Sequence, residues 1–322
     1  MTEQPLPRNS GLDLVRATEA AALSAGRWMG FGKRDKADHH AIIAMYDALN
    51  MLNIDGCIVI GEEGKLGESS VLASGQRVGT GQGPAVDVVV DPIDGRNLLA
   101  QGKPGAIAVA AIAPRGSMWS PRPAIYMEKI VVSRQAAQVL VPECMNAPVA
   151  WTLALVARAK HKEVRDLIVF VLDRPRHHDL IEEIRVAGAR VMLRSDGDIA
   201  GAIMSAAPEG LADMLIGIGG VAEGVIAACA IKAMGGAILG RLAPQSDEER
   251  AALAAAGLDS QRILTSDELI TSRQIFFAAT GITDGALLSG VKYQSNRAET
   301  QSMILRCETG TRRFIEAEHL IE

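Results

Sequence analysis

Aromatic residues are scarce in this chain, because Phe, Trp and Tyr together make up only 3% of its 322 residues. Few rings are therefore available to stack on bases, which argues against single-stranded nucleic-acid binding. The 33 basic residues are outnumbered by 38 acidic ones and form no long run that could follow a phosphate backbone. We therefore expect no nucleic-acid partner.

Long apolar runs and paired cysteines are missing as well. The longest uncharged apolar stretch, residues 104–114, is much shorter than the roughly 20 residues that a membrane-spanning helix needs. Residues 1–10 are polar and lack the basic-then-apolar layout of a signal peptide. The four cysteines are scattered without a CxxC pair, which is typical of reduced thiols in the cytoplasm. The sequence therefore predicts a cytoplasmic protein with no membrane partner.

Hydrophobic residues make up 48% of the chain, enough for a substantial core. After residue 142 apolar strand-like and helix-like segments alternate, which favours a layered α/β body. We expect an N-terminal α/β region over residues 1–145 and a C-terminal α/β region over residues 146–322, joined in one compact unit with a soft boundary near residues 140–150. In the first region, Asp38 is expected to open a helix.

Acidic residues follow two predicted strands at the points where the strands end. They are Glu62 and Glu63 after strand 57–60, and Asp91 and Asp94 after strand 85–90. Ligands tend to bind where strands end in layered α/β proteins. Carboxylates that converge there repel one another unless a hard divalent cation compensates. The pattern therefore predicts a Mg²⁺ or Mn²⁺ site, able to support hydrolysis of a phosphate ester.

The stretch Asp91-Pro92-Ile93-Asp94-Gly95 resembles the metal-binding motif of the lithium-sensitive phosphatase superfamily. Over nearly its whole length, the chain resembles one branch of it, the class II (GlpX-type) fructose-1,6-bisphosphatases of bacteria. The resemblance rests on ordered stretches that include Lys36-Ala37-Asp38, Val59-Ile60-Gly61-Glu62, Gly79 to Pro84, Tyr126 to Lys129, Arg174-Pro175-Arg176-His177, Ser195 to Asp198, Gly217 to Gly220, Glu223-Gly224 and Ala279 to Gly285.

The resemblance implies a layered α-β-α-β-α sandwich of the sugar and inositol phosphatase type, in a dimer or tetramer. The residues that match the family's metal ligands are Asp38, Glu62, Asp91, Asp94 and Glu223. Those that match its sugar-phosphate contacts are Asp94, Gly95, Tyr126, Arg174, Pro175, Arg176, Asp196, Gly197, Asp198 and Gly220. The chemistry agrees, since arginine offers a planar fork for phosphate and aspartate accepts from sugar hydroxyls.

The chain departs from the family in the loop that helps to orient or deprotonate the attacking water. The stretch from Gly61 to Leu72 is one residue longer than the family pattern. It lacks the family's proline and the acidic residue that in the family supports the attacking water. Either Glu63 or Glu68 could take over, because general-base help requires only a carboxylate near the water. We favour Glu63 over Glu68 as the catalytic residue.

A second departure follows the Asp-Gly pair, where Arg96 replaces the family's threonine. Arginine stays protonated and cannot act as a base. Arg96 is therefore a candidate catalytic or substrate-binding residue that clamps a phosphate, or it points away and pairs with a neighbouring acid.

Two hypotheses follow. In the first, the chain is a metal-dependent phosphatase of carbohydrate metabolism that removes the 1-phosphate of fructose 1,6-bisphosphate or of a related bisphosphate, including a seven- or eight-carbon sugar. In the second, it is a catalytically impaired paralogue that binds sugar phosphate for regulation or partner assembly. A retained fold does not by itself decide between them.

Overall fold

The computed structural model describes residues 6–63, 70–208 and 210–321. Its contacts divide the chain into two compact units, one formed by Met1–Met118 and Ser272–Glu322 and the other by Trp119–Thr271. These units do not coincide with the consecutive regions 1–145 and 146–322 drawn from the sequence. The C-terminal segment belongs to the first unit because β11 (Phe276–Gly281) pairs with β4 (Ile107–Pro114).

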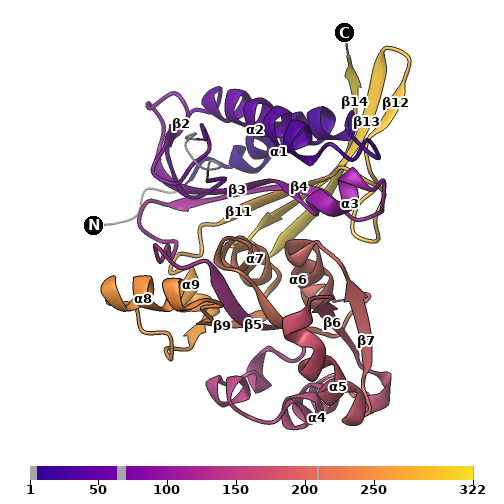
Figure 1. The fold of residues 1–322 in the computed structure, drawn as a ribbon. Coiled ribbons are helices and arrows are strands. Elements are labelled where there is room, and N and C mark those ends of the chain that lie inside the picture. Colours follow the sequence, from indigo (N-terminus) through magenta and orange to yellow (C-terminus); the bar gives the residue numbers. More distant parts are fainter. Residues whose placement is uncertain (1–5, 64–69, 209, 322) are drawn as a thin grey trace. The chain divides into compact units, whose positions relative to one another are not determined.

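The first unit is built on a mixed sheet with the strand order β12-β13-β11-β4-β3-β1-β2, and β14 pairs with β13 (Figure 1). Its other strands are β1 (Asp55–Ile60), β2 (Arg77–Val78), β3 (Ala85–Asp94), β12 (Lys292–Gln294), β13 (Arg297–Arg306) and β14 (Thr311–Leu320). Its helices are α1 (Ser10–Gly26), α2 (Arg34–Asn50) and α3 (Arg96–Ala100).

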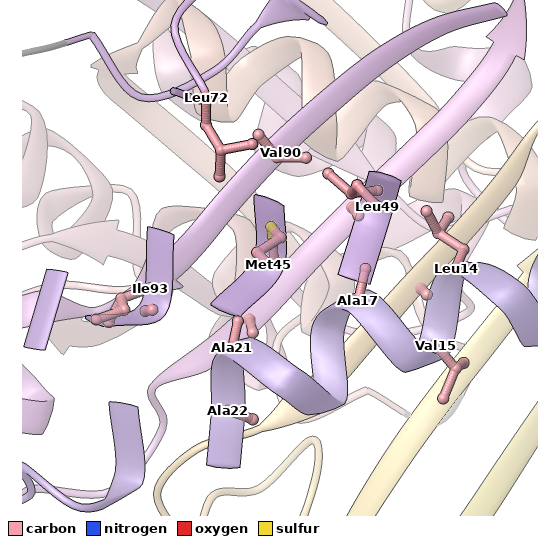
Figure 2. Close-up of a cluster of buried hydrophobic side chains, with 14 of the residues drawn as sticks. Leu14, Val15, Ala17, Ala21, Ala22, Met45, Leu49, Leu72, Val90 and Ile93 are labelled. Carbon is pink, nitrogen blue, oxygen red and sulfur yellow. The ribbon is translucent and has the colours of Figure 1, made fainter. Parts of the chain in front are cut away.

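Small side chains allow α1 to pack closely in the core of this unit. Figure 2 shows Ala17 and Ala21 of α1 in one cluster with Met45 and Leu49 of α2 and Val90 of β3. All five residues are buried. The core of this unit is therefore packed through small and aliphatic side chains, in keeping with the low aromatic content of the chain.

The second unit has a sheet with the strand order β10-β9-β5-β8-β6-β7. Its strands are β5 (Tyr126–Val132), β6 (Ile168–Leu172), β7 (Arg190–Arg194), β8 (Met214–Gly220), β9 (Ala237–Leu242) and β10 (Leu264–Thr265). Its helices are α4 (Val149–Ala159), α5 (His178–Val186), α6 (Asp198–Ala206), α7 (Val221–Met234), α8 (Asp247–Ala255) and α9 (Ser266–Leu269). Short 3₁₀ turns lie at Ala137–Val139, Pro142–Met145, Val164–Asp166 and Pro175–His177.

Both faces of this second sheet are covered. Leu153 of α4 and Ile184 of α5 share a core cluster with Val169 of β6. On α6, Gly201 allows close packing, because an added Cβ would lie 2.4 Å from ring atom Cε1 of Phe170. The predicted α/β class is therefore confirmed.

One predicted boundary is wrong. Asp38 does not open the second helix, which begins a turn earlier at Arg34. The charged residues 34–36 are exposed, so they can lie on the solvent side of a helix without a burial cost. Within the described ranges, every helix is too short or too polar to cross a lipid bilayer.

Candidate active site

Two of the predicted acidic segments lie at the ends of neighbouring strands. β1 and β3 run parallel and pair from Asp55 opposite Ala85 onward. Parallel strands end at the same edge of a sheet, so residues 61–63, which follow β1, and the last residues of β3, Asp91–Asp94, lie toward the same edge. The parallel pairing of β1 with β3 therefore explains how acids almost 30 positions apart in the sequence lie at one edge of the sheet.

An irregularity in β3 places Asp91 and Asp94 on one face of the sheet. Asp91 is opposite Val109 and Asp94 is opposite Ile107, so β3 contains one extra residue at this point. Residues three apart in a regular strand would point to opposite faces, and the bulge restores a common direction. The two carboxylates are 8% and 4% exposed, respectively. The main-chain N–H of Ile93 donates to Oδ1 of Asp91 over 3.0 Å and fixes that side chain.

Gly95 turns the chain from β3 into α3. Its φ of +97° lies in the left-handed region that favours glycine, and an added Cβ would lie 3.2 Å from Cα of Ala106. The turn places Arg96 at the first position of α3, directly after the two aspartates. The glycine of the motif is therefore needed for the backbone path that positions Arg96.

The guanidinium of Arg96 joins two of the predicted metal ligands. Its Nε lies 3.4 Å from Oδ1 of Asp38, and its Nη2 donates to Oε2 of Glu62. The side chains of Asp38 and Glu62 are only 13% and 15% exposed. The arginine thus takes the neighbouring-acid orientation that the sequence left open, and its partners come from α2 and from the end of β1.

The charge around Arg96 is strongly negative. Burial alone would lower the pKa of its guanidinium, but the carboxylates of Glu62, Asp91 and Asp38 raise that pKa above the ordinary arginine value. Arg96 is therefore a permanent cation within a cluster of acids. We call Asp38, Glu62, Asp91 and Asp94 the acidic cluster.

Carboxylate oxygens are the donors that Mg²⁺ and Mn²⁺ prefer, so the chemistry of the acidic cluster fits such an ion. In the described part of the chain, however, no three acidic, His or Cys side chains are arranged as a ready metal site. Glu63 is exposed, and its Oε1 accepts from the main-chain N–H of Ser74 over 3.2 Å. Glu68, the other candidate base, lies outside the described residues.

The second unit gathers most of the predicted sugar-phosphate residues at one edge of its own sheet, whereas Asp94 and Gly95 lie in the first unit. β6 runs parallel to both β7 and β8, so the segments that follow these strands leave the sheet on the same side. Arg174, Pro175 and Arg176 follow β6; Asp196, Gly197 and Asp198 follow β7; Gly220 ends β8. Tyr126 begins the antiparallel strand β5 directly opposite Gly220.

The two arginines of this group are held differently. Arg176 donates from Nε and Nη2 to the carbonyl oxygen of Ile218 over 3.1 and 2.7 Å, and its guanidinium lies 5.2 Å from the centre of the Tyr126 ring. Nη2 of Arg174 lies 3.7 Å from Oδ1 of Asp196, with one third of the arginine side chain exposed. Two nitrogens of Arg176 are thus engaged by a carbonyl oxygen, whereas Arg174 makes a long ion pair, so the guanidinium fork of Arg174 is the more available for an anion.

Asp198 has a partner that the sequence did not predict. Its Oδ2 accepts from Nζ of Lys129, whose side chain is 1% exposed. The ammonium also lies 3.4 Å from the carbonyl oxygen of Gly220. An added Cβ on Gly219 would lie 2.0 Å from Oδ2 of Asp198, so glycine is required beside this pair. The signal in the sequence was a lysine directly before the apolar run 130–132.

His177 is a second residue without a predicted role. Its Nδ1 lies 2.7 Å from the carbonyl oxygen of Leu172, and its Nε2 accepts from the main-chain N–H of Ile218 over 2.8 Å. Burial lowers the pKa of the ring, so the neutral form is favoured. The ring ties the segment after β6 to β8 and so braces the loop that carries Arg174 and Arg176.

Glu223, the remaining predicted metal ligand, lies in the first turn of α7 in the second unit. The Glu223 carboxylate lies close against Gly220, because a Cβ added at Gly220 would clash with Oε2 of Glu223. The structure thus brings Asp38, Glu62 and Arg96 into contact within the first unit. It brings the predicted sugar-phosphate residues other than Asp94 and Gly95 to one sheet edge within the second unit.

Known proteins resemble this chain along nearly its whole length. Residues 8–319 match the family model described as bacterial fructose-1,6-bisphosphatase, glpX-encoded. The chain is 38% identical over 328 aligned residues to a class 2 fructose-1,6-bisphosphatase of Escherichia coli strain K12, covering 98% of this chain and 96% of that protein. A class 2 fructose-1,6-bisphosphatase of Shigella flexneri matches to the same extent. Among solved structures, an extragenic suppressor from Pyrococcus furiosus matches with 11% sequence identity and a TM-score of 0.28. The match covers 61% of this chain and 68% of the suppressor chain.

Proposed function

Because the chain belongs to the family of glpX-encoded bacterial fructose-1,6-bisphosphatases, we propose that it is a phosphoric monoester hydrolase that removes the 1-phosphate of fructose 1,6-bisphosphate or a related sugar bisphosphate. We further propose that Mg²⁺ or Mn²⁺ is its cofactor. A cytoplasmic location and a dimer or tetramer remain predictions of the sequence.

One observation carries the proposal. Asp38, Glu62 and Asp91 come from three separate segments of the chain, and all three carboxylates act on the single guanidinium of Arg96. Three acids that the sequence suggested as metal ligands therefore lie near one another in the fold. Such a concentration of buried carboxylates is costly for stability, which supports a functional reason for keeping it.

In this proposal, the acidic cluster holds the divalent cation, and Glu223 is a proposed metal ligand on the strength of the resemblance alone. The bound cation supplies charge stabilisation to the phosphoryl oxygens. Asp91 and Asp94 are suited to this role because the bulge in β3 gives them a common direction. Their low exposure strengthens their interaction with any cation nearby.

The residues at the sheet edge of the second unit are proposed to bind the sugar phosphate. Arg174 offers a guanidinium fork to a phosphate, and Tyr126 can donate from its hydroxyl. Asp196 can accept from a sugar hydroxyl. Asp198 is buried against Lys129 and is better suited to hold the loop than to bind the sugar directly.

Glu63 is proposed to orient the attacking water. Its side chain is exposed and accepts from the main-chain N–H of Ser74, so a small change of rotamer would turn the carboxylate toward a bound water. A carboxylate within hydrogen-bond reach of the water is sufficient for general-base help. Glu68 remains the alternative candidate.

The contact between Arg96 and Glu62 also favours a second candidate function. A guanidinium among the acids could limit turnover and leave a protein that binds sugar phosphate for regulation or partner assembly. In that case the chain would bind sugar bisphosphates without releasing phosphate.

Phosphate release separates the two candidates. We would measure inorganic phosphate with Mg²⁺ and with Mn²⁺, using fructose 1,6-bisphosphate, seven- and eight-carbon sugar bisphosphates and inositol phosphates as substrates. Turnover on a sugar bisphosphate supports the hydrolase and identifies its sugar. Thermal stabilisation by these compounds without release of phosphate from any of them would reject the hydrolase and support the sugar-phosphate-binding protein.

A further inference from the structure

β14 is an edge strand of the sheet in the first unit, and it runs beside β13 toward the C-terminus (Figure 1). Its ten residues, Thr311–Leu320, pair along their whole length with β13 and, among the strands that the structure describes, with no other. β11 and β12 pair with the other side of β13. Every second residue of an edge strand points its N–H and C=O away from the sheet. β14 therefore presents a backbone edge of about 34 Å to which another strand can pair.

The inner side of β14 is anchored. Nε2 of His319 lies 2.8 Å from Oγ1 of Thr300 on β13, and that hydroxyl donates to Oε1 of Glu19 on α1 over 3.3 Å. In the middle of the strand, Ile315 packs against the core of the first unit. The edge is therefore a preformed strand, which lowers the entropy cost of pairing with it.

The face of β14 opposite Ile315, which we call its outer face, carries opposite charges at its two ends. Arg312 and Phe314 come first, and the guanidinium lies 5.4 Å from the centre of the Phe314 ring. Glu316 and Glu318 follow on the same face, because alternate residues of a strand share a face. Phe314 is 52% exposed. The outer face thus reads positive, apolar, then negative along the strand.

A cavity of about 350 Å³ lies beside the negative end of this face. Its lining includes Glu299 of β13, Glu316 and Glu318 of β14, and the cation Lys292 of β12. Glu318 also pairs with Arg297, whose side chain is half exposed. Three carboxylates facing two cations leave one negative charge in excess. The cavity therefore suits one further guanidinium.

A second copy of β14 supplies that guanidinium when the two strands pair antiparallel. With Ile315 opposite Ile315 of the second copy, residues 311–319 of the two strands pair. Arg312 then lies opposite Glu318 of the second copy and diagonal to its Glu316. A two-fold axis repeats the contact, so each copy gives one arginine and receives one. An in-register parallel pairing would place like charges directly opposite one another, which is unfavourable.

We propose that β14 is an interface through which two copies of this chain associate, as one continuous sheet across a two-fold axis. The order of charges on the outer face favours a second copy over an unrelated strand, since the copy carries the matching order by symmetry. The inference goes beyond the proposed hydrolysis and uses none of its residues. It gives the predicted dimer or tetramer one of its interfaces.

Sedimentation velocity of the purified full-length protein over a range of concentrations tests this. Arg312→Glu and Glu318→Arg each place like charges opposite one another and should weaken association at least about tenfold. A dimer should then become a monomer, and a tetramer a pair of dimers. An equimolar mixture of the two variants places opposite charges together again at both ends, so it should regain the mass of the unchanged protein.

Arg313→Glu is the matched control. Arg313 is an exposed neighbour on the same strand, but its side chain lies on the other face and would be opposite Ala317 of the second copy. The variant changes the net charge by the same amount and should keep the original mass. Weakening equal to that of Arg312→Glu would overturn the proposal, because net charge would then explain the effect.

Three further outcomes would also overturn it. They are unchanged mass in both Arg312→Glu and Glu318→Arg, a mixture of these variants that stays dissociated, and an unchanged protein that is monomeric at every concentration. In the last case the charges of β14 would only keep its edge solvated.

Hydrogen–deuterium exchange reads the strand edge itself, and it serves if Glu318→Arg does not fold once Arg297 has lost its partner. In the associated unchanged protein, the amides of residues 311–319 that point away from β13 should be protected. In Arg312→Glu these amides should exchange faster, while those that bond to β13 stay protected. Equal exchange of the outward amides in the two proteins would contradict pairing at this edge.

Discussion

The ammonium of Lys129 pairs with the carboxylate of Asp198, and both side chains are almost completely buried in the second unit. The pair connects the middle of β5 to the first residue of α6. It therefore fixes the segment after β7, which contains Asp196 and Gly197, at the sheet edge where sugar phosphate is proposed to bind.

Removing one member of this pair leaves a buried charge uncompensated. Lys129→Met should lower the free energy of unfolding by about 3–5 kcal/mol in urea denaturation. The double variant Lys129→Met with Asp198→Asn should recover part of this loss. Lys162→Met is the control, because Lys162 is 41% exposed and its partner Asp213 keeps Lys160 at 2.9 Å. Equal losses for Lys129→Met and the control would contradict a structural role for the pair.

His177 should make the stability of the second unit depend on pH. Burial lowers the pKa of the ring below its usual value of 6.5, although the charge of Asp198 opposes the shift and those of Arg176 and Arg174 add to it. The unfolded chain then binds more protons than the folded one just below pH 6.5. The contribution of His177 is therefore complete above that pH and is lost as the pH falls through the lower, folded-state pKa.

Urea denaturation at pH 7.5 and at pH 5.5 would measure this dependence. His177→Gln should be less stable than the unchanged protein at pH 7.5, and its stability should fall less on acidification. His178→Gln, at the exposed neighbouring residue, should keep the original dependence. An unaltered pH dependence in His177→Gln would show that the ring is not its source.

Arg174 should contribute to binding of the substrate's phosphate. Charge-assisted hydrogen bonds contribute about 1.5–3 kcal/mol, so Arg174→Ala should raise KM by roughly 10- to 100-fold. Arg185→Ala provides the control, because Arg185 is an exposed arginine of α5 paired with Glu182 at 2.6 Å. Steady-state kinetics on the preferred sugar bisphosphate would distinguish them. A KM for Arg174→Ala equal to that of the control would remove Arg174 from the site.

The order of apolar, polar and turn-forming residues along the sequence predicted those parts of the fold that depend on residues adjacent in sequence. The alternation of apolar segments after residue 142 predicted the α/β class. The strand predicted over residues 85–90 is longer in the structure, because β3 continues through a bulge to Asp94 and so contains both aspartates. By contrast, α4 has few helix-start signals: its N-cap is Pro148, which offers no side-chain hydrogen bond, and the helix was not predicted.

Long-range pairing could not be predicted in the same way. Lys129 and Asp198 are 69 positions apart, and nothing local to either residue marks the other as its partner. The sequence left two orientations open for Arg96, since both a phosphate and a neighbouring acid suit a guanidinium. The acids that decide between them come from α2 and from the end of β1, and only the assembled sheet brings them together.

The metal dependence of phosphate release tests the central claim most directly. Phosphate release from fructose 1,6-bisphosphate would be followed against Mn²⁺ and Mg²⁺ concentration for the unchanged protein, Asp91→Asn and, as a control, Asp55→Asn at the opposite end of β1. The unchanged protein and Asp55→Asn should be activated by the metal and inactive in EDTA. Asp91→Asn should lose at least about 100-fold in kcat/KM, since a bound cation contributes several kcal/mol of charge stabilisation. Full activity in EDTA, or an Asp91→Asn variant as active as Asp55→Asn, would contradict the account.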